Sequence, residues 1–393
     1  MPTLVNLKSN YSPLYYLAAL GAGGLSVSFF MYLNFLIPHN GFPMVMADIL
    51  IAHGSSNLWH IPFILLAIAG IIYFAYQHIL LLIWNIREFK AFKTTQAYED
   101  LSQTNGEVAL MAIPLTYAMS INVGFVLGAT FVPGLWSVIE WLFPLALLGF
   151  LAVGIYALQL YGAYFTRLMI KANFTPETNN NFSQLIAIFA FSMIAVGFAT
   201  PGAMSGIPLV SAIGIFGAIF FAVTAIGLGV LKIIFAMRDI FAQGINAETS
   251  VSLWIMIPIL TLLGITAIRI TFGVAHNFTG EHHVANWVIF LLSSTILALQ
   301  LIFGWIGYKV MKEVGYFKTY IHGDTKSPVS FAIICPGVAL FVFGVFFIML
   351  GLVPNNIVTL YSPLFYALFA ILAWVQWLTI KTFWTLRAKN LYI

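Results

Sequence analysis

The stretch from Pro328 to Val353 reads PVSFAIICPGVALFVFGVFFIMLGLV and contains 26 residues without one charged side chain. A helix needs about 20 mainly apolar residues to cross the hydrocarbon core of a bilayer, which is ~30 Å thick. The run is continuously apolar and does not alternate between apolar and polar residues, as a strand of a membrane barrel would. It therefore predicts a transmembrane helix.

Nine further stretches are also long and mainly apolar. The chain of 393 residues is 61% hydrophobic and 7% charged, whereas an ordinary soluble domain is about 25% charged. We predict an all-α integral membrane protein forming a single transmembrane domain over 1–393. The first stretch is taken as a retained helix and not a signal peptide. The ten helices are expected at 12–37, 59–86, 108–132, 135–168, 183–201, 207–236, 250–275, 285–311, 328–353 and 361–385.

Basic residues set the predicted orientation. Fifteen of the 16 Lys and Arg residues precede the first helix or lie near or beyond the C-terminal end of an even-numbered one. They are Lys8, Arg87, Lys90, Lys93, Arg167, Lys171, Lys232, Arg238, Lys309, Lys312, Lys318, Lys326, Lys381, Arg387 and Lys389. Cytoplasmic loops carry such an excess, so we expect both termini inside, in a multi-pass protein of the inner (plasma) membrane. The net charge of +4 does not suggest nucleic-acid binding.

The odd-numbered helices resemble one another. Prolines lie near the start of four of them, at Pro13, Pro114, Pro258 and Pro336, and the last three are separated by 144 and 78 residues. The sequence thus indicates five helical hairpins with a period of about 75 residues. Proline kinks a helix, and irregular helices are tolerated in membranes where they line a path.

The odd helices are also rich in small residues, whereas the even ones carry most of the tryptophans. We therefore expect the five hairpins to form a ring, with the odd helices around a central pore and the even helices outside. The alternative is that small residues only allow close helix packing.

The ninth helix reads Phe331-Ala332-Ile333-Ile334-Cys335-Pro336, and the first contains Leu25-Ser26-Val27-Ser28-Phe29-Phe30. With ten helices in five hairpins, these segments resemble the tellurite-resistance/dicarboxylate transporter family, which includes bacterial TehA channels and plant slow anion channels. A divergent bacterial branch such as the TsoY group fits best. The resemblance implies a homotrimer that carries small anions through one pore per subunit. In that family a Phe before the ninth-helix kink plugs the pore, and Cys335 stands there in this chain.

Pore or gate positions are therefore expected on the odd helices. The candidates are Cys335, Pro336, Phe125, Phe198, Phe347, Asn122, Pro114 and Pro258. Cys335 is the sole cysteine, so it either packs as a small apolar residue or faces the path and reacts there.

Arg269 is the one basic residue expected away from the inner face. A charge inside the membrane is costly, so it needs a partner or a function. Arg269 either attracts anions into an outer vestibule, or pairs with Glu140 at similar depth, or extends towards the outer headgroups.

Six of the eight histidines are expected at the outer face. Their spacing gives at most a weak metal site at His276, His282 and His283, so we predict no metal and no cofactor. His78 is the only histidine deep in a helix, and a b-type haem would need a second one at its depth.

Two functions remain open. The first is an anion channel or secondary transporter for small inorganic or sulfur-containing anions; the scarcity of acidic groups in the helices argues against cation selectivity. The alternative is a membrane-embedded redox or sulfur-handling protein acting through Cys335. The residues offer no basis for an enzyme of the soluble type.

Overall fold

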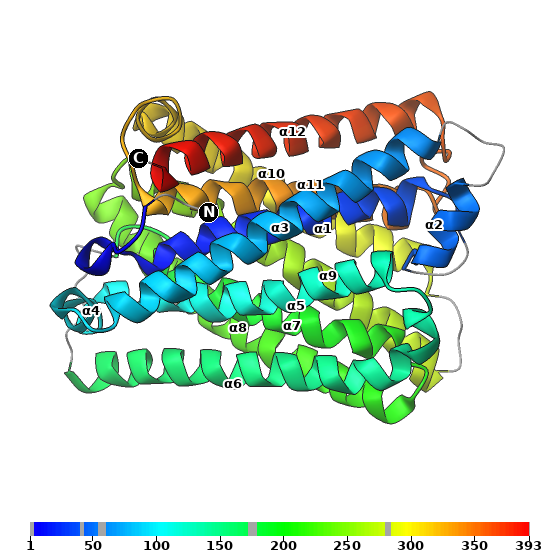
Figure 1. Ribbon diagram of the computed structural model, residues 1–393, viewed down its shortest axis with the longest axis horizontal. Coiled ribbons are helices and arrows are strands. Elements are labelled where there is room, and N and C mark those ends of the chain that lie inside the picture. The colour runs from blue at the N-terminus through cyan, green and yellow to red at the C-terminus, as the bar shows by residue number, and fades with distance from the viewer. Residues whose placement is uncertain (1–3, 40–42, 54–59, 172–178, 280–283, 393) are drawn as a thin grey trace.

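The computed structural model describes residues 4–39, 43–53, 60–171, 179–279 and 284–392. In this part of the chain every regular element is helical, and ten helical spans are long and apolar enough to cross a membrane. These are Pro13–Leu36, Ile61–Phe92, Asn105–Phe131, Leu135–Lys171, Ser183–Met204, Pro208–Gln243, Thr249–Thr279, Asn286–Glu313, Pro328–Leu352 and Pro363–Leu391. The helices run alongside one another (Figure 1). An all-helical membrane protein with ten apolar spans is thereby confirmed.

The predicted spans coincide with the observed ones to within a few residues at most ends. The clear difference is at the C-terminal ends of the even-numbered spans, which run two to seven residues further than predicted. The second, for example, ends at Phe92 and the sixth at Gln243, against predictions of 86 and 236. Apolar length marks only the part that lipid requires, and a helix continues past it into polar sequence.

Each odd-numbered span begins with a 3₁₀ segment that leads into an α-helix. The pairs are η2 (Pro13–Tyr15) with α1 (Tyr16–Leu36), η3 (Asn105–Met111) with α5 (Ala112–Phe131), η6 (Ser183–Leu185) with α7 (Ile186–Met204), η7 (Thr249–Ile255) with α9 (Met256–Val274), and η10 (Pro328–Ile333) with α11 (Ile334–Phe346). The last four α-helices begin at residues 112, 186, 256 and 334, at intervals of 74, 70 and 78.

The structure places three of the four prolines at the junctions between these segments. Pro114, Pro258 and Pro336 are each the third residue of an α-helix, directly after a 3₁₀ segment. The N–H group that each proline lacks is therefore missing close to the point where the 3₁₀ segment becomes an α-helix.

Each even-numbered span is one long α-helix, and only the fourth begins with a 3₁₀ segment, η4 (Leu135–Val138). The five α-helices are α3 (His60–Phe92), α6 (Ile139–Lys171), α8 (Pro208–Gln243), α10 (Asn286–Glu313) and α12 (Pro363–Leu391). Each packs against the odd helix that precedes it. In the most apolar windows of the odd spans 61 to 100% of residues are buried, against 17 to 50% in the even spans. The helices expected inside are thus the more buried ones.

The odd helices also contact each other. α1 packs against α5 and α11, α7 packs against α5 and α9, and α9 packs against α11. At one end of the molecule lie both termini and the short helix α4 (Gln96–Leu101), and at the other lies α2 (Met46–His53) (Figure 1).

Candidate functional site

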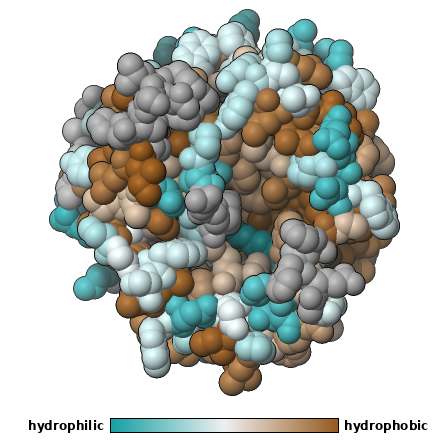
Figure 2. Space-filling model, turned by 90° about the vertical axis from the view of Figure 1, so that its right-hand side faces the viewer, coloured by the Kyte–Doolittle hydropathy of each residue, from teal (hydrophilic) through white to brown (hydrophobic). Residues whose placement is uncertain are grey.

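A cavity of about 190 Å³ lies between the odd helices and reaches towards the end that carries α2. All five odd helices line it, together with Phe143, Ala146 and Phe150 of α6 and Pro43 of the loop before α2. Figure 2 views this end, where the surface is hollowed near its centre and hydrophilic atoms lie deep in the hollow.

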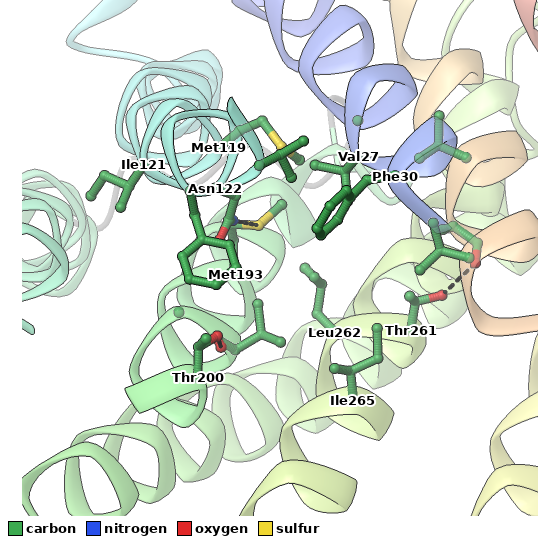
Figure 3. Close-up of a pocket in the computed structure, with 18 of the residues that line it drawn as sticks. Val27, Phe30, Met119, Ile121, Asn122, Met193, Thr200, Thr261, Leu262 and Ile265 are labelled. Atoms are coloured by element: carbon green, nitrogen blue, oxygen red, sulfur yellow. Dashed lines mark hydrogen bonds between the residues drawn. The ribbon is translucent and has the colours of Figure 1, made fainter. Parts of the chain in front are cut away.

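One face of each helix supplies the lining. On α7 it follows Phe189, Met193, Val196 and Thr200; on α9, Pro258, Thr261, Ile265 and Arg269; on α11, Cys335, Val338, Val342 and Phe346. These steps of three or four residues are the repeat of an α-helix. In the close-up, Val27 and Phe30 of α1 lie across the cavity from Met193, Leu262 and Ile265 (Figure 3). The wall is therefore mostly apolar, with a few polar groups set into it.

Arg269 is the charged group in this lining. Its Nη1 atom donates to the carbonyl oxygen of Val196 at 3.0 Å and to Oγ1 of Thr200 at 2.6 Å, both on α7. An arginine at mid-helix costs about 2.5–3.5 kcal/mol on insertion scales, and hydrogen bonds to charged groups contribute about 1.5–3 kcal/mol each. Two such bonds offset the cost, so α7 can hold the charge in place through hydrogen bonds alone.

Glu140 does not supply that counter-charge. Its carboxylate accepts hydrogen bonds from Oγ of Ser205 at 2.6 Å and from the backbone N–H of Gly206 at 2.7 Å. Among the described residues no carboxylate lies within ion-pair distance of Arg269. The Arg269–Glu140 pair that sequence alone left open is therefore absent, and Glu140 caps the turn after α7 instead.

Two further polar residues of the lining make local bonds. Nδ2 of Asn122 lies 3.5 Å from the sulfur of Met193, and Oγ1 of Thr261 donates to the carbonyl oxygen of Ala339 at 3.1 Å (Figure 3). Nε2 of Gln300 on α10 donates to the same Oγ1 at 2.6 Å. Thr261 thus uses its donor and one of its acceptor positions, whereas the amide oxygen of Asn122 accepts no hydrogen bond from the described residues.

A second, smaller cavity of about 50 Å³ lies among the 3₁₀ segments, towards the end that carries the termini. It is lined by Leu14, Leu17, Ser183, Ile186, Phe189, Val251, Ser252, Ile255, Pro258, Val329, Ala332 and Cys335. Phe189, Pro258 and Cys335 line both cavities. These three residues therefore stand between the two spaces; we call them the constriction.

The predicted pore residues fall into two groups. The first group lines the larger cavity and consists of Cys335, Pro258, Phe125, Asn122 and Arg269.

The other four candidates do not line either cavity. Phe198 is buried and packs against the rings of Phe150 and Phe221, 6.3 and 5.7 Å away between centroids. Phe347 stacks on Phe290 of α10. Pro114 and Pro336 lie at the starts of their helices and are absent from the lining.

The histidines give no metal centre within the described residues, where no group of three or more His, Cys, Asp or Glu side chains is close enough to hold an ion. His276 lies in a π-helical turn (η8, Ala275–Thr279), and His282 and His283 fall outside the described residues. His78 is buried, with Nδ1 2.8 Å from the carbonyl oxygen of Ala19 and Nε2 2.9 Å from Oγ of Ser120. Both nitrogens are thus occupied by bonds to α1 and α5, which fits a structural role.

Phe189 and Met193 were missed from the sequence. α7 lacks the early proline of its neighbours, so nothing on that helix marked the lining face. The helical repeat continued from Cys335 and Pro258 along α11 and α9, then transferred to α7 by the period of the hairpins, would have found that face.

Comparison with known proteins identifies no relative: no family model, no curated protein and no solved structure matches the chain.

Proposed function

We propose that the protein is an anion channel or secondary transporter whose path runs through the two cavities between the five odd helices. The observation that carries the proposal is Arg269, a half-buried arginine on the wall of an apolar cavity, hydrogen-bonded to α7 and without a carboxylate partner among the described residues. A fixed positive charge in a low-dielectric wall favours anions and repels cations.

Helix packing supports a ring of five hairpins around this path. Each odd helix contacts two others, in the order α1, α5, α7, α9, α11 and back to α1. The larger cavity extends to Pro43 and Met204 near one end, and the smaller one to the 3₁₀ segments near the other. The constriction separates them, and Phe189 is the bulkiest side chain there. Passage then requires that the Phe189 ring move.

The charge pattern supports a proposed orientation. The end that carries both termini also holds the C-terminal ends of the even helices, where most basic residues lie. We place that end in the cytoplasm, in the inner (plasma) membrane. The larger cavity then opens outwards and the smaller one inwards. The family resemblance drawn from the first and ninth helices adds a homotrimer to the proposal, which cross-linking in native membranes tests.

Chloride efflux from liposomes tests the function. Purified protein is reconstituted in vesicles loaded with potassium chloride, with valinomycin present to balance charge, and external chloride is followed with an electrode. We expect efflux at least about tenfold above empty vesicles, and a loss of about tenfold in Arg269→Gln. Arg238→Gln, the same change at an exposed residue of α8, is the control and should match the unaltered protein. Equal efflux from Arg269→Gln would contradict the proposed role of Arg269.

The alternative function, redox or sulfur chemistry at Cys335, rests on one residue. Cys335 is buried, and it is one of the three residues of the constriction. The same vesicles separate the two functions. Efflux that survives Cys335→Ser supports a path, whereas an absence of efflux together with a thiol adduct at Cys335 supports the alternative.

A further inference from the structure

The guanidinium of Arg269 is held by one of its three nitrogens. Nη1 donates to Val196 and Thr200, while Oγ1 of Thr200 itself donates to the carbonyl oxygen of Val196 at 3.1 Å. This small network on α7 fixes the plane of the guanidinium. Within the described part of the chain, Nε and Nη2 donate no hydrogen bond, and Arg269 lines the cavity. One edge of the guanidinium therefore remains available.

The shape of this edge decides which anion it recognises. Nε–H and one Nη2–H point side by side, and such a pair matches two oxygens of a carboxylate or of a planar or tetrahedral oxyanion. A halide is a single point and cannot use both donors with good geometry. We propose that Arg269 forms a selective site for a small oxyanion, which deepens the proposed function by naming the substrate class and rests on it for how the anion reaches the site.

The surroundings fit a small oxyanion. Val196 accepts a hydrogen bond from Arg269, Ile265 precedes it by one turn of α9, and both line the cavity, as does Phe346 of α11. Charge-assisted bonds are stronger against such apolar neighbours than in water. The volume of about 190 Å³ is many times the ~10–15 Å³ that a cavity needs to hold one water molecule. A nitrate-sized or formate-sized anion with a partial water shell fits that space.

Nitrate and bromide are suitable probes, because they carry the same charge and lose water at similar cost but differ in shape. Binding is measured first, as the rise in unfolding temperature of the detergent-solubilised protein on titration with each anion. We expect nitrate to bind at least about tenfold more tightly than bromide. Arg269→Lys keeps the charge and removes the paired donors, so the preference should fall to within about twofold.

A second variant keeps the test open if Arg269→Lys fails to fold. Thr200→Val removes the hydroxyl that orients Nη1 and should lower the nitrate preference by about threefold. Thr271→Val is the matched control, since the Thr271 hydroxyl donates only to the carbonyl oxygen of Ala267 and lies outside the cavity lining. It should leave the preference unchanged.

Vesicle efflux of the two anions then separates the proposed oxyanion site from the proposed anion transport. A nitrate preference in binding that is lost in Arg269→Lys supports the oxyanion site, and if no efflux accompanies it, transport is the claim that fails. Efflux of both anions with equal binding, unchanged in Arg269→Lys, overturns the oxyanion site and leaves anion transport standing. Neither binding nor efflux overturns both.

Discussion

At the scale of single residues, the constriction is built from three different side chains: Phe189, Pro258 and Cys335. The proline and the cysteine are small or rigid, so neither can swing far. Phe189 lines a cavity on each of two sides, so we expect its ring to be the part that moves. The residue expected to gate the path from the ninth-helix pattern, Cys335, therefore shares that place with an aromatic ring from another helix.

Truncating this ring should open the path. We expect Phe189→Ala to raise chloride efflux by about tenfold, because the bulkiest group of the constriction is lost. Phe347→Ala, which removes a half-buried ring stacked on Phe290 outside the lining, should leave efflux within about twofold. Efflux that is unchanged in Phe189→Ala, or equally raised in Phe347→Ala, would show that Phe189 does not block the path.

At the scale of elements, buried glutamines join outer helices to inner ones. Gln376 of α12 donates through Nε2 to Oγ of Ser28 at 2.8 Å and accepts through Oε1 from the hydroxyl of Tyr32 at 2.6 Å. Both partners are on α1, so the last hairpin is tied to the first. Gln300 makes a comparable link from α10 to Thr261 and to the carbonyl oxygen of Ile257 on α9.

Replacing Gln376 should weaken this closure. Gln376→Leu keeps the side-chain size but leaves the buried hydroxyl of Tyr32 without its acceptor, which costs about 1–3 kcal/mol. We therefore expect a lower unfolding temperature in detergent. Gln159→Leu, at an exposed position of α6, is the control and should be neutral or slightly stabilising in lipid. Equal stability of the two variants would mean that the Gln376 link contributes nothing.

The sequence predicted the helical spans more accurately than it predicted which residues line the cavity. Apolar runs such as 328–353 are imposed by lipid and can be read directly, so the spans agree. Which face of a helix points inwards depends on its neighbours, and the lining of α7 was missed for that reason. Arg269 and Asn122 were predicted correctly because a polar side chain in an apolar helix is costly unless it has a partner or a function. Phe198 and Phe347 were chosen only as large rings on odd helices, and both pack against the outer helices.

At the scale of the whole molecule, the position of the basic residues predicts a fixed orientation. If the end with both termini is cytoplasmic, a fluorescent protein fused after Ile393 should fluoresce in a bacterial host, because it folds in the cytoplasm. Alkaline phosphatase fused after Asn355, at the opposite end, should be active, because it requires the periplasm. The reverse result for both fusions would invert the orientation and the assignment of the two cavities.

If anions cross between the five odd helices, a bulky side chain placed inside the cavity should stop them. Ala339 of α11 lines the cavity, whereas Ala370 of α12 is exposed on the outside. The measurement is chloride efflux from vesicles that contain Ala339→Trp or Ala370→Trp, each first shown to be folded by its unfolding temperature. We predict that Ala339→Trp abolishes efflux and Ala370→Trp leaves it unchanged. Undiminished efflux through a folded Ala339→Trp protein would mean that anions do not cross between the odd helices.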